Sequence, residues 1–267
     1  MTKDPRLDTI PRGNTCRGVN RSVIEAFLGS ADANGAFSIL DVPCGDGDLL
    51  DAVKVFFPNA ATFGIDISSP DEKFAHHFTQ ADAAFLTRDD LPAEPCRLIS
   101  CISGVMEFDN SLNFFRLLRD ALEDDGRLVV TNDNLLTVRD RFLYFLFGRF
   151  GQYKAFLDDD AQTWKVVPMH TLVRVLKDAG LEVESVRYVV GRSVDWLWLA
   201  IGLPIYAIQL LYFIFGESNR GLDHKLRNYP LRSLIARHYL LVCKKGPQPR
   251  HVRPALLDSG QAADPEP

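Results

Sequence analysis

Residues 41–50 read DVPCGDGDLL, and they follow directly on the apolar run Phe37-Ser38-Ile39-Leu40. The next residues, DLLDAVKVFF, place apolar side chains on one helical face before Pro58. A buried strand, a glycine-rich turn and a helix therefore follow one another. Such a unit forms a ligand pocket at the carboxyl edge of a parallel sheet. Its glycines let the ligand approach the backbone, and its helix start offers unpaired N–H groups.

The turn favours a positively charged ligand over a dinucleotide. The dinucleotide fingerprint GxGxxG needs a third glycine, but Leu50 stands there after Gly45 and Gly47. Asp41, at the end of the strand, would repel a pyrophosphate, whereas a carboxylate suits a ligand that carries positive charge. An oxidoreductase with a Rossmann dinucleotide site is therefore less favoured.

The remainder of the chain alternates strand and helix patterns. Apolar runs predict strands, and amphipathic runs or cap residues predict helices. This alternation indicates a mostly parallel sheet with helices on both faces. The segments 134–168 and 191–235 interrupt the pattern. The expected strands are 37–42, 61–67, 97–103, 127–133, 181–190 and 237–245, and the expected helices are 22–28, 48–57, 110–122 and 170–180, with His76 and His77 on a further helix.

Composition excludes several function classes. The formal net charge is −5, which does not favour a nucleic-acid partner. The five cysteines are scattered and form no CxxC pair, so we expect neither a disulfide framework nor a metal site, and the pattern fits a reducing compartment. The N-terminal residues contain no apolar stretch typical of a secretory signal.

The segment LDVPCGDG, residues 40–47, resembles the first motif, LDxGCGxG, of the class I S-adenosylmethionine-dependent methyltransferases. Pro43 stands where that family has a glycine. The resemblance covers residues 20–133 well and 165–245 more loosely. It implies an α/β fold, a Rossmann-like, doubly wound, mostly parallel seven-stranded sheet with an antiparallel last strand. It also implies S-adenosyl-L-methionine as the cofactor.

The family motif implies roles for individual residues. Asp66, nineteen residues beyond Gly47, matches the acid that accepts hydrogen bonds from the ribose hydroxyls. Asp82 matches the acid that receives the adenine amino group, with a backbone N–H from Ala83. Ser103 lies in LISCISGVMEF, which matches the region around the methionine end of the cofactor. The full set of predicted cofactor-binding residues is Asp41, Pro43, Cys44, Gly45, Gly47, Asp66, Ile67, Asp82, Ala83 and Ser103.

Candidate bases for a hydroxyl acceptor are His170 and Glu107. A histidine is suited to proton transfer near neutral pH, and relatives often carry one before the helix that His170 begins. Glu107 matches the acid of a Glu-His pair in many relatives, but Phe108 replaces the histidine. The alternative for His170 is a helix residue with no catalytic role. The alternative for Glu107 is a residue that only shapes the pocket. The residues Asn132, Asp133 and Asn134 either contact the acceptor or form a turn.

Residues 196–215, WLWLAIGLPIYAIQLLYFIF, contain no charge over twenty positions. Twenty apolar residues are enough to cross a bilayer, but the flanking strands form an antiparallel pair in the resembled fold, so the segment must return to the side it left. Because Pro204 interrupts a helix, we predict two short apolar helices, 195–202 and 204–215, that form a shallow re-entrant hairpin or an interfacial membrane surface. A buried helix pair and a dimer interface are the alternatives.

Basic residues accompany the apolar segments. Between Glu217 and Arg250 there are eight Lys or Arg and two acids, and residues 139–154 mix basic with aromatic side chains. This pattern favours the anionic cytoplasmic leaflet, or else a solvated face or a phosphate of the acceptor. The expected organisation is an N-terminal cap (1–36), a methyltransferase domain (37–245) with insertions 134–168 and 191–235 and a membrane-associating segment 194–216, and a disordered tail (246–267).

The sequence thus predicts a peripheral or monotopic enzyme on the inner face of the cell membrane. It would methylate, most simply at oxygen, a lipid, a lipid-linked glycan or another membrane-resident acceptor. One alternative is a soluble small-molecule methyltransferase with an apolar dimer interface. Another is a non-catalytic membrane-recruited scaffold that retains the fold. The sequence fixes neither the acceptor nor the oligomeric state.

Overall fold

The computed structural model describes residues 4–11, 15–150, 165–190, 193–216 and 221–247. Within this part of the chain, seven strands form one sheet in the order β3-β2-β1-β4-β5-β7-β6. The strands are β1 (Ser38–Asp41), β2 (Ala61–Asp66), β3 (His77–Gln80), β4 (Cys96–Ile102), β5 (Leu122–Asp133), β6 (Leu181–Val189) and β7 (His238–Lys245). The α-helices are α1 (Val19–Leu28), α2 (Asp48–Phe56), α3 (Ser111–Ala121), α4 (Val138–Phe147), α5 (Met169–Asp178), α6 (Leu199–Phe215) and α7 (Leu222–Asn228).

The sheet confirms the predicted fold class. Strands β3, β2, β1, β4 and β5 pair in parallel. Strand β7 is inserted between β5 and β6 and runs antiparallel to both. The chain winds outward from β1 to β3 and then from β4 to β5 in the other direction, so the winding changes direction between β1 and β4.

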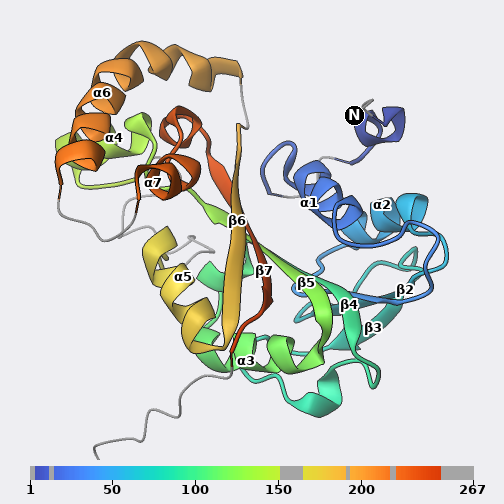
Figure 1. Cartoon of the computed structure of the whole chain (residues 1–267). Coiled ribbons are helices and arrows are strands. Elements are labelled where there is room, and N and C mark those ends of the chain that lie inside the picture. Colours follow the sequence, from blue (N-terminus) through green and yellow to red (C-terminus); the bar gives the residue numbers. More distant parts are fainter. Residues whose placement is uncertain (1–3, 12–14, 151–164, 191–192, 217–220, 248–267) are drawn as a thin grey trace, which may run out of the picture.

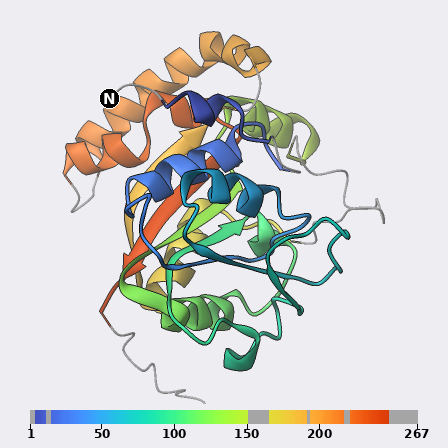
Figure 2. The same cartoon turned by 90° about the vertical axis from the view of Figure 1, so that its right-hand side faces the viewer.

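Helices cover both faces of the sheet and enclose two apolar cores (Figures 1 and 2). Helices α1 and α2 bury residues such as Phe27, Val53 and Phe56 on one face. Helices α3 and α5 bury residues such as Phe115 and Leu176 on the other. Each strand at the centre is therefore apolar on both sides, as expected for a doubly covered parallel sheet.

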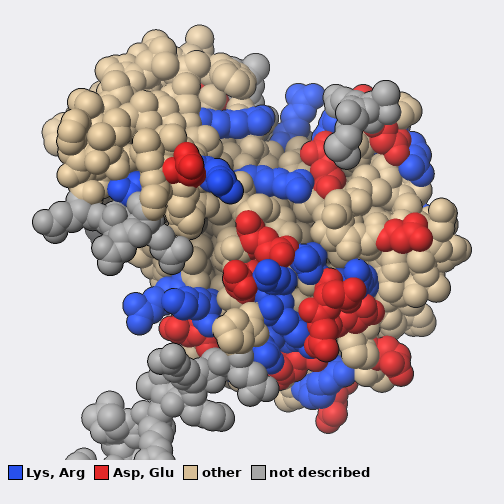
Figure 3. Space-filling model, in the orientation of Figure 1, with Lys and Arg blue, Asp and Glu red and all other residues tan. Residues whose placement is uncertain are grey.

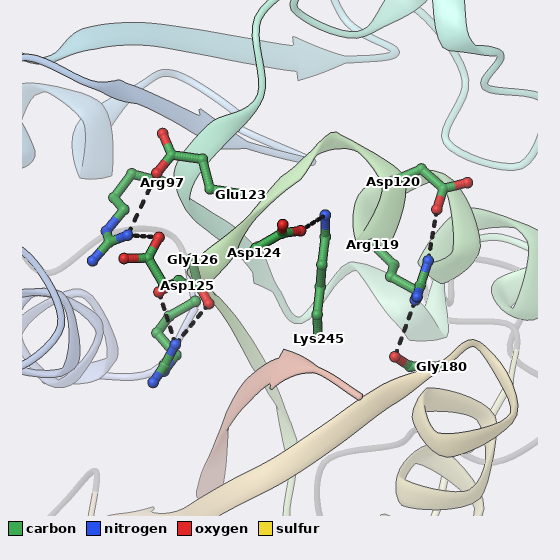
Figure 4. Close-up of polar contacts among 10 residues, drawn as sticks. Arg97, Arg119, Asp120, Glu123, Asp124, Asp125, Gly126, Gly180 and Lys245 are labelled. Atoms are coloured by element: carbon green, nitrogen blue, oxygen red, sulfur yellow. Dashed lines mark hydrogen bonds and ion pairs between the residues drawn. The ribbon is translucent and has the colours of Figure 1, made fainter. Parts of the chain in front are cut away.

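A cluster of ion pairs holds the edge of the sheet where β4 and β5 begin (Figure 4). Arg97 pairs with Glu123 and Asp125, and Lys245 Nζ lies 3.0 Å from Asp124 Oδ1. Arg119 of α3 donates to the carbonyl of Gly180 at 3.1 Å. This edge lies opposite the one where the glycine-rich turn is found, so these charges serve the fold rather than a ligand.

Two sequence predictions are wrong, at the start of β5 and just before β3. Strand β5 begins at Leu122, directly after α3 ends at Ala121, rather than at residue 127. His77 begins strand β3 and His76 precedes it, so neither lies on a helix. The imidazole of His76 instead bonds Thr62 Oγ1 at 2.8 Å and Asp51 Oδ1 at 3.0 Å. These hydrogen bonds between residues distant in the sequence hold the start of β3 in place. The residues of β3 show no alternation of apolar and polar side chains that would predict a strand.

The predicted break at Pro204 is also wrong. A 3₁₀ helix spans Ser193–Trp198, and α6 then continues through Pro204 to Phe215. Proline leaves the carbonyl four residues earlier without its helical donor, here that of Ala200. Because Ala200 and Pro204 are both exposed, that carbonyl can take its hydrogen bond from outside the fold. The helix predicted to start at Pro204 therefore starts at Leu199 and continues through the proline, and the segment divides before Leu199 rather than at Pro204.

Both interruptions of the strand–helix rhythm leave from the carboxyl edge of the sheet. Helix α4 follows β5 there, and the segment from β6 to β7 both leaves and returns there because β7 is antiparallel. Helices α4, α6 and α7 lie together beyond this edge, at the upper left of Figure 1. Residues 151–164, 191–192, 217–220 and 248–267 of the predicted insertions and tail lie outside the described residues.

An ion pair attaches the apolar segment to the sheet. The Arg237 guanidinium, just before β7, donates to both carboxylate oxygens of Asp195 at 2.7–3.0 Å. The Asp195 side chain is 4% exposed and that of Arg237 is 17% exposed. Asp195 begins the apolar segment, so this contact sets where the segment departs from the sheet.

We predict that Asp195→Ala lowers the free energy of unfolding by about 3 kcal/mol, because a largely buried guanidinium loses its carboxylate. Chemical denaturation measures the effect. The double variant Asp195→Ala/Arg237→Met should recover much of the loss, because it leaves no uncompensated charge. A double variant no more stable than Asp195→Ala would contradict the role given to the pair.

Candidate active site

The carboxyl ends of β1, β2, β3 and β4 bring four loops to one edge of the sheet, at the point where the winding changes direction. In open α/β sheets this switch point is where ligands bind. The loop after β1 is the glycine-rich turn, and it lies between the loops after β2 and β4 because β1 pairs with both strands. Sequence positions more than sixty residues apart thus meet at a single site.

The glycine-rich turn is held against the end of β2. The N–H of Gly45 donates to Asp66 Oδ2 at 2.9 Å, and the N–H of Ser68 donates to Asp66 Oδ1 at 3.0 Å. Gly45 has φ +50°, and a Cβ there would meet nothing within 4 Å, so its backbone borders open space. A ligand can approach this backbone closely, and Asp66 keeps lone pairs for ligand hydroxyls.

The loop after β3 supplies a second carboxylate. Asp82 Oδ1 accepts a hydrogen bond from the N–H of Ala84 at 2.8 Å, while Ala83 is half-buried. Two large apolar side chains flank this region without burial: Ile67 is 64% exposed and Phe85 is 80% exposed. Exposed apolar surface beside two oriented carboxylates suits a flat aromatic ring that also carries hydrogen-bond donors.

The loop after β4 packs on the glycine-rich turn. Gly104 begins a 3₁₀ turn (Gly104–Met106), and a Cβ on it would lie 2.4 Å from Pro43 Cδ. Ser103 takes φ +57° and donates its N–H to the Thr131 carbonyl at 3.1 Å. Among the described residues the buried Ser103 Oγ has no hydrogen-bond partner. A ligand at this edge would supply one.

Asp41 is buried behind the turn, not exposed within it. It is 2% exposed, and its Oδ1 accepts a hydrogen bond from Ser100 Oγ at 2.7 Å. Burial raises the pKa of Asp41 to about 7, with a further contribution from the charge of Asp66. The buried Cys44 thiol has its pKa raised by burial and by the same two acids, so it is not a nucleophile.

The loops therefore form an acidic edge that fits S-adenosylmethionine. Its carboxylates can accept hydrogen bonds from hydroxyl and amino groups, and they favour a sulfonium and an ammonium group over a phosphate. Asp66 and Asp82 would hold the nucleoside, and Gly45, Gly47 and Ser103 would border the amino-acid part. The described residues contain no group of three or more His, Cys, Asp or Glu side chains placed to hold a metal ion.

The two candidate bases lie in different places. Glu107 follows the Gly104 turn, and the loss of water around its carboxyl group together with the charge of Asp66 raises the pKa of that group. His170 is exposed at the start of α5 and lines a small cleft with Asn134, Leu136 and Tyr229. Phe108 is buried and packs on Phe114, at a ring-centroid distance of 4.6 Å. The structure thus joins Glu107 to the acidic edge but gives His170 a separate cleft.

The end of β5 is occupied by hydrogen bonds within the fold. Asn134 donates to the carbonyls of Ser233 and Ala236, both at 2.7 Å, so it fixes the loop before β7. Asp133 Oδ1 lies 2.8 Å from His238 Nε2, and His238 Nδ1 is buried with no partner among the described residues. The sequence did not single out His238, because only the β5–β7 register places it opposite Asp133.

The fold and this acidic edge define a class I S-adenosylmethionine-dependent methyltransferase. A family model described as a methyltransferase domain matches residues 15–186, which is more than half of the chain. The chain therefore belongs to this methyltransferase family, and its cofactor is S-adenosyl-L-methionine. No curated protein sequence matches the chain significantly.

Solved structures share the fold at low sequence identity. A methyltransferase from Archaeoglobus fulgidus is 14% identical with a TM-score of 0.54, covering 91% of this chain and 100% of its own. The mycolic acid cyclopropane synthase CmaA1, solved with SAH and CTAB, is 15% identical with a TM-score of 0.54, covering 91% and 94%. Coclaurine N-methyltransferase, bound to N-methylheliamine and SAH, is 15% identical with a TM-score of 0.51, covering 87% and 72%.

We predict that Asp66→Ala weakens S-adenosylmethionine binding by at least about tenfold, the value of one good charge-assisted hydrogen bond. Titration calorimetry measures the affinity. Asp71→Asn removes an exposed carboxylate from the next loop and should bind the cofactor as the unaltered protein does. Equal affinities for the two variants would contradict the assignment of Asp66.

The raised pKa of Asp41 leads us to predict that the stability of the fold depends on pH. The pKa of Asp41 is about 7 in the folded state against 3.8 in the unfolded chain, so the folded state holds the extra proton between these values. The free energy of unfolding should therefore fall as pH rises from about 4 to 7, by up to about 4 kcal/mol. Urea denaturation of Asp41→Asn should lack this component. Parallel pH profiles for the two proteins would show that Asp41 does not titrate as described.

Proposed function

We propose that this methyltransferase acts at the cytoplasmic surface of a membrane and transfers the methyl group to an oxygen atom of a lipid, a lipid-linked glycan or another membrane-resident acceptor. The observation that carries the proposal is an apolar surface beside the cofactor edge. Helices α4 and α6 present large apolar side chains to solvent. We call this surface the apolar face: Phe142, Tyr144, Phe145, Leu146, Phe147, Val194, Trp196, Leu197, Ile201, Leu203, Ile208, Leu211, Tyr212, Ile214 and Phe215.

The apolar face and the cofactor loops belong to the same edge of the sheet. Helix α4 begins five residues after β5 ends, and the segment that contains α6 joins two strands at their ends on that edge. Figure 3 shows that the lobe formed by these helices carries little charge, whereas acidic and basic side chains gather in the central and lower part of that view. A protein held to a bilayer by this lobe would present its cofactor edge toward the membrane.

The cleft of His170 lies at the end of β5 and borders a residue that packs on α6. One wall is Tyr229, whose ring centroid lies 5.9 Å from that of Phe213 on α6. An acceptor that leaves the bilayer along α6 would reach this cleft before the end of β5. His170 or Glu107 would then take the hydroxyl proton. The cofactor supplies a methyl group already activated by its sulfonium, so the protein's main task is to align the acceptor.

The alternative functions and arrangements differ in what would cover the apolar face. A buried helix pair does not fit, because Asp195 and Gly202 are the only buried residues from Val194 to Phe215. A soluble enzyme with an apolar dimer interface would cover the face with a second copy. A non-catalytic scaffold would keep the fold but would not bind the cofactor, and Pro43 and Phe108 are the departures from the family pattern that support it.

We predict that label from methyl-labelled S-adenosylmethionine enters the organic phase when the purified protein is incubated with vesicles made from lipid of its own cells. The label should not enter soluble extract from the same cells, because the acceptor is expected in the membrane. Scintillation counting after solvent extraction measures the transfer. Asp71→Asn serves as the matched control and should transfer normally, whereas Asp66→Ala should transfer at a rate lower by about tenfold or more at limiting cofactor.

Two outcomes would overturn the proposal. Transfer to soluble extract alone, by a protein that light scattering shows to be a dimer, would favour the small-molecule enzyme. Absence of cofactor binding, with no change on Asp66→Ala, would favour the scaffold.

A further inference from the structure

We propose that α6 lies in the plane of an anionic bilayer leaflet and does not cross the membrane. The inference rests on the membrane docking of the proposed function but not on methyl transfer. The segment Val194–Phe215 is long and apolar enough to cross a membrane by composition. What decides between crossing and lying flat is how the helix is attached to the rest of the fold.

Within the described part of the chain, one stripe of α6 contacts the protein, and that stripe runs along the whole length of the helix. The less exposed positions recur every three or four residues, which is the period of a single helix face. The opposite face is exposed throughout: Ile201, Ile208 and Phe215, each seven residues from the next, are 47%, 68% and 80% exposed. The covered stripe comprises Leu199, Gly202, Ile205, Tyr206, Gln209, Leu210, Phe213 and Gly216.

A helix that is apolar on all sides is stable only inside a protein core or against a membrane. Here the outer face of α6 is as apolar as its covered face, and the described residues provide no cover for it. The neighbouring helix α4 adds Phe145 and Phe147, which are 84% and 65% exposed. Phe142 of α4 contacts Trp198 at a ring-centroid distance of 6.4 Å, so the two helices form a continuous surface.

Contacts at the start, middle and end of the segment hold α6 against the domain. At the start, Asp195 binds Arg237. In the middle, Gly202 lies against Val138 and Leu234, since a Cβ there would be 3.5 Å from Val138 Cγ2. At the end, Lys225 Nζ donates to the Phe213 carbonyl at 2.7 Å.

These contacts are incompatible with α6 crossing a bilayer. A helix that crosses a bilayer is surrounded by lipid over the length of the hydrocarbon core, so α6 would have to lose its contacts along most of the covered stripe. Lying flat keeps every contact and still places the outer face in lipid.

Charge identifies the leaflet as anionic. The described residues 138–150, 193–216 and 221–237 contain seven Lys or Arg and three Asp. Two of the three acids, Asp140 and Asp195, are buried, whereas Arg149, Arg227 and Arg232 are exposed. In Figure 3 basic side chains border the uncharged lobe. Basic residues around an apolar surface bind acidic headgroups and disfavour a second copy of the same positively charged surface.

Fluorescent labels on the outer face test the orientation. Single cysteines at Ile201→Cys, Ile208→Cys and Phe215→Cys can carry an environment-sensitive nitrobenzoxadiazole label, because the five native cysteines are all buried. On vesicles of phosphatidylcholine with phosphatidylglycerol, all three labels should report the same shallow depth. Dithionite added outside should reduce all three at similar rates.

A crossing helix would give a different result, with the Ile208→Cys label deepest and the Ile201→Cys and Phe215→Cys labels near opposite surfaces, one of them protected from dithionite. That result overturns the inference. So does binding to no vesicle, or labels that become apolar without lipid as protein concentration rises, which would show a dimer. Cofactor affinity, measured on the same labelled proteins, separates a docking failure from a loss of fold or of methyltransferase function.

Charge reversal tests the lipid class. Arg227→Glu/Arg232→Glu should weaken binding to vesicles containing phosphatidylglycerol by at least about tenfold, since each basic residue near an anionic surface contributes, and should change binding to pure phosphatidylcholine little. The matched control, Arg174→Glu/Lys177→Glu, reverses two exposed charges on α5 and should bind as the unaltered protein does. Equal losses in both double variants would show that general charge, not this surface, sets the affinity.

Discussion

The antiparallel insertion of β7 between β5 and β6 determines where the special features of this methyltransferase lie. A strand that runs against its neighbours begins at the edge where they end. The long connection from β6 to β7 therefore starts and finishes at the carboxyl edge of the sheet. This is the edge where a doubly wound sheet binds its ligand. The apolar segment and the cofactor loops are brought to one side of the molecule by strand direction alone.

The cofactor loops and the apolar face therefore meet at that edge, and different interactions hold each of them in place. The cofactor loops depend on carboxylates held in place by the backbone, as Asp66 is by Gly45 and Ser68. Burial keeps Asp41 partly protonated behind them, so the negative potential at the edge increases as pH rises through neutrality. The apolar face depends instead on a few contacts under α6, chiefly the Asp195–Arg237 pair and the close packing at Gly202. The cofactor loops also bury Val42, Val105 and Met106 in one of the two apolar cores, whereas the residues of the apolar face belong to neither core.

The sequence predicts the central strands and the donor ligand well, because both leave local patterns. The runs that became β1, β4 and β5 are apolar on both faces, and the spacing of Asp41, Gly45 and Asp66 is a feature of the family. Prediction from the sequence fails where contacts between distant residues determine the local structure. Strand β3 is four residues long and is fixed by pairing with β2 and by the His76 bonds. Helix α6 passes through Pro204 because the affected carbonyl is exposed, and His238 meets Asp133 only through the β5–β7 register.

We propose that one edge of this sheet holds S-adenosylmethionine and receives its acceptor from a membrane. Native mass spectrometry of the protein released from membranes, before and after S-adenosylmethionine is added, tests this most directly. We expect a copurifying lipid or lipid-linked species whose mass increases by one methylene when the cofactor is present, and no increase with Asp66→Ala. A protein that carries no lipid, and that methylates only a soluble molecule, would contradict it.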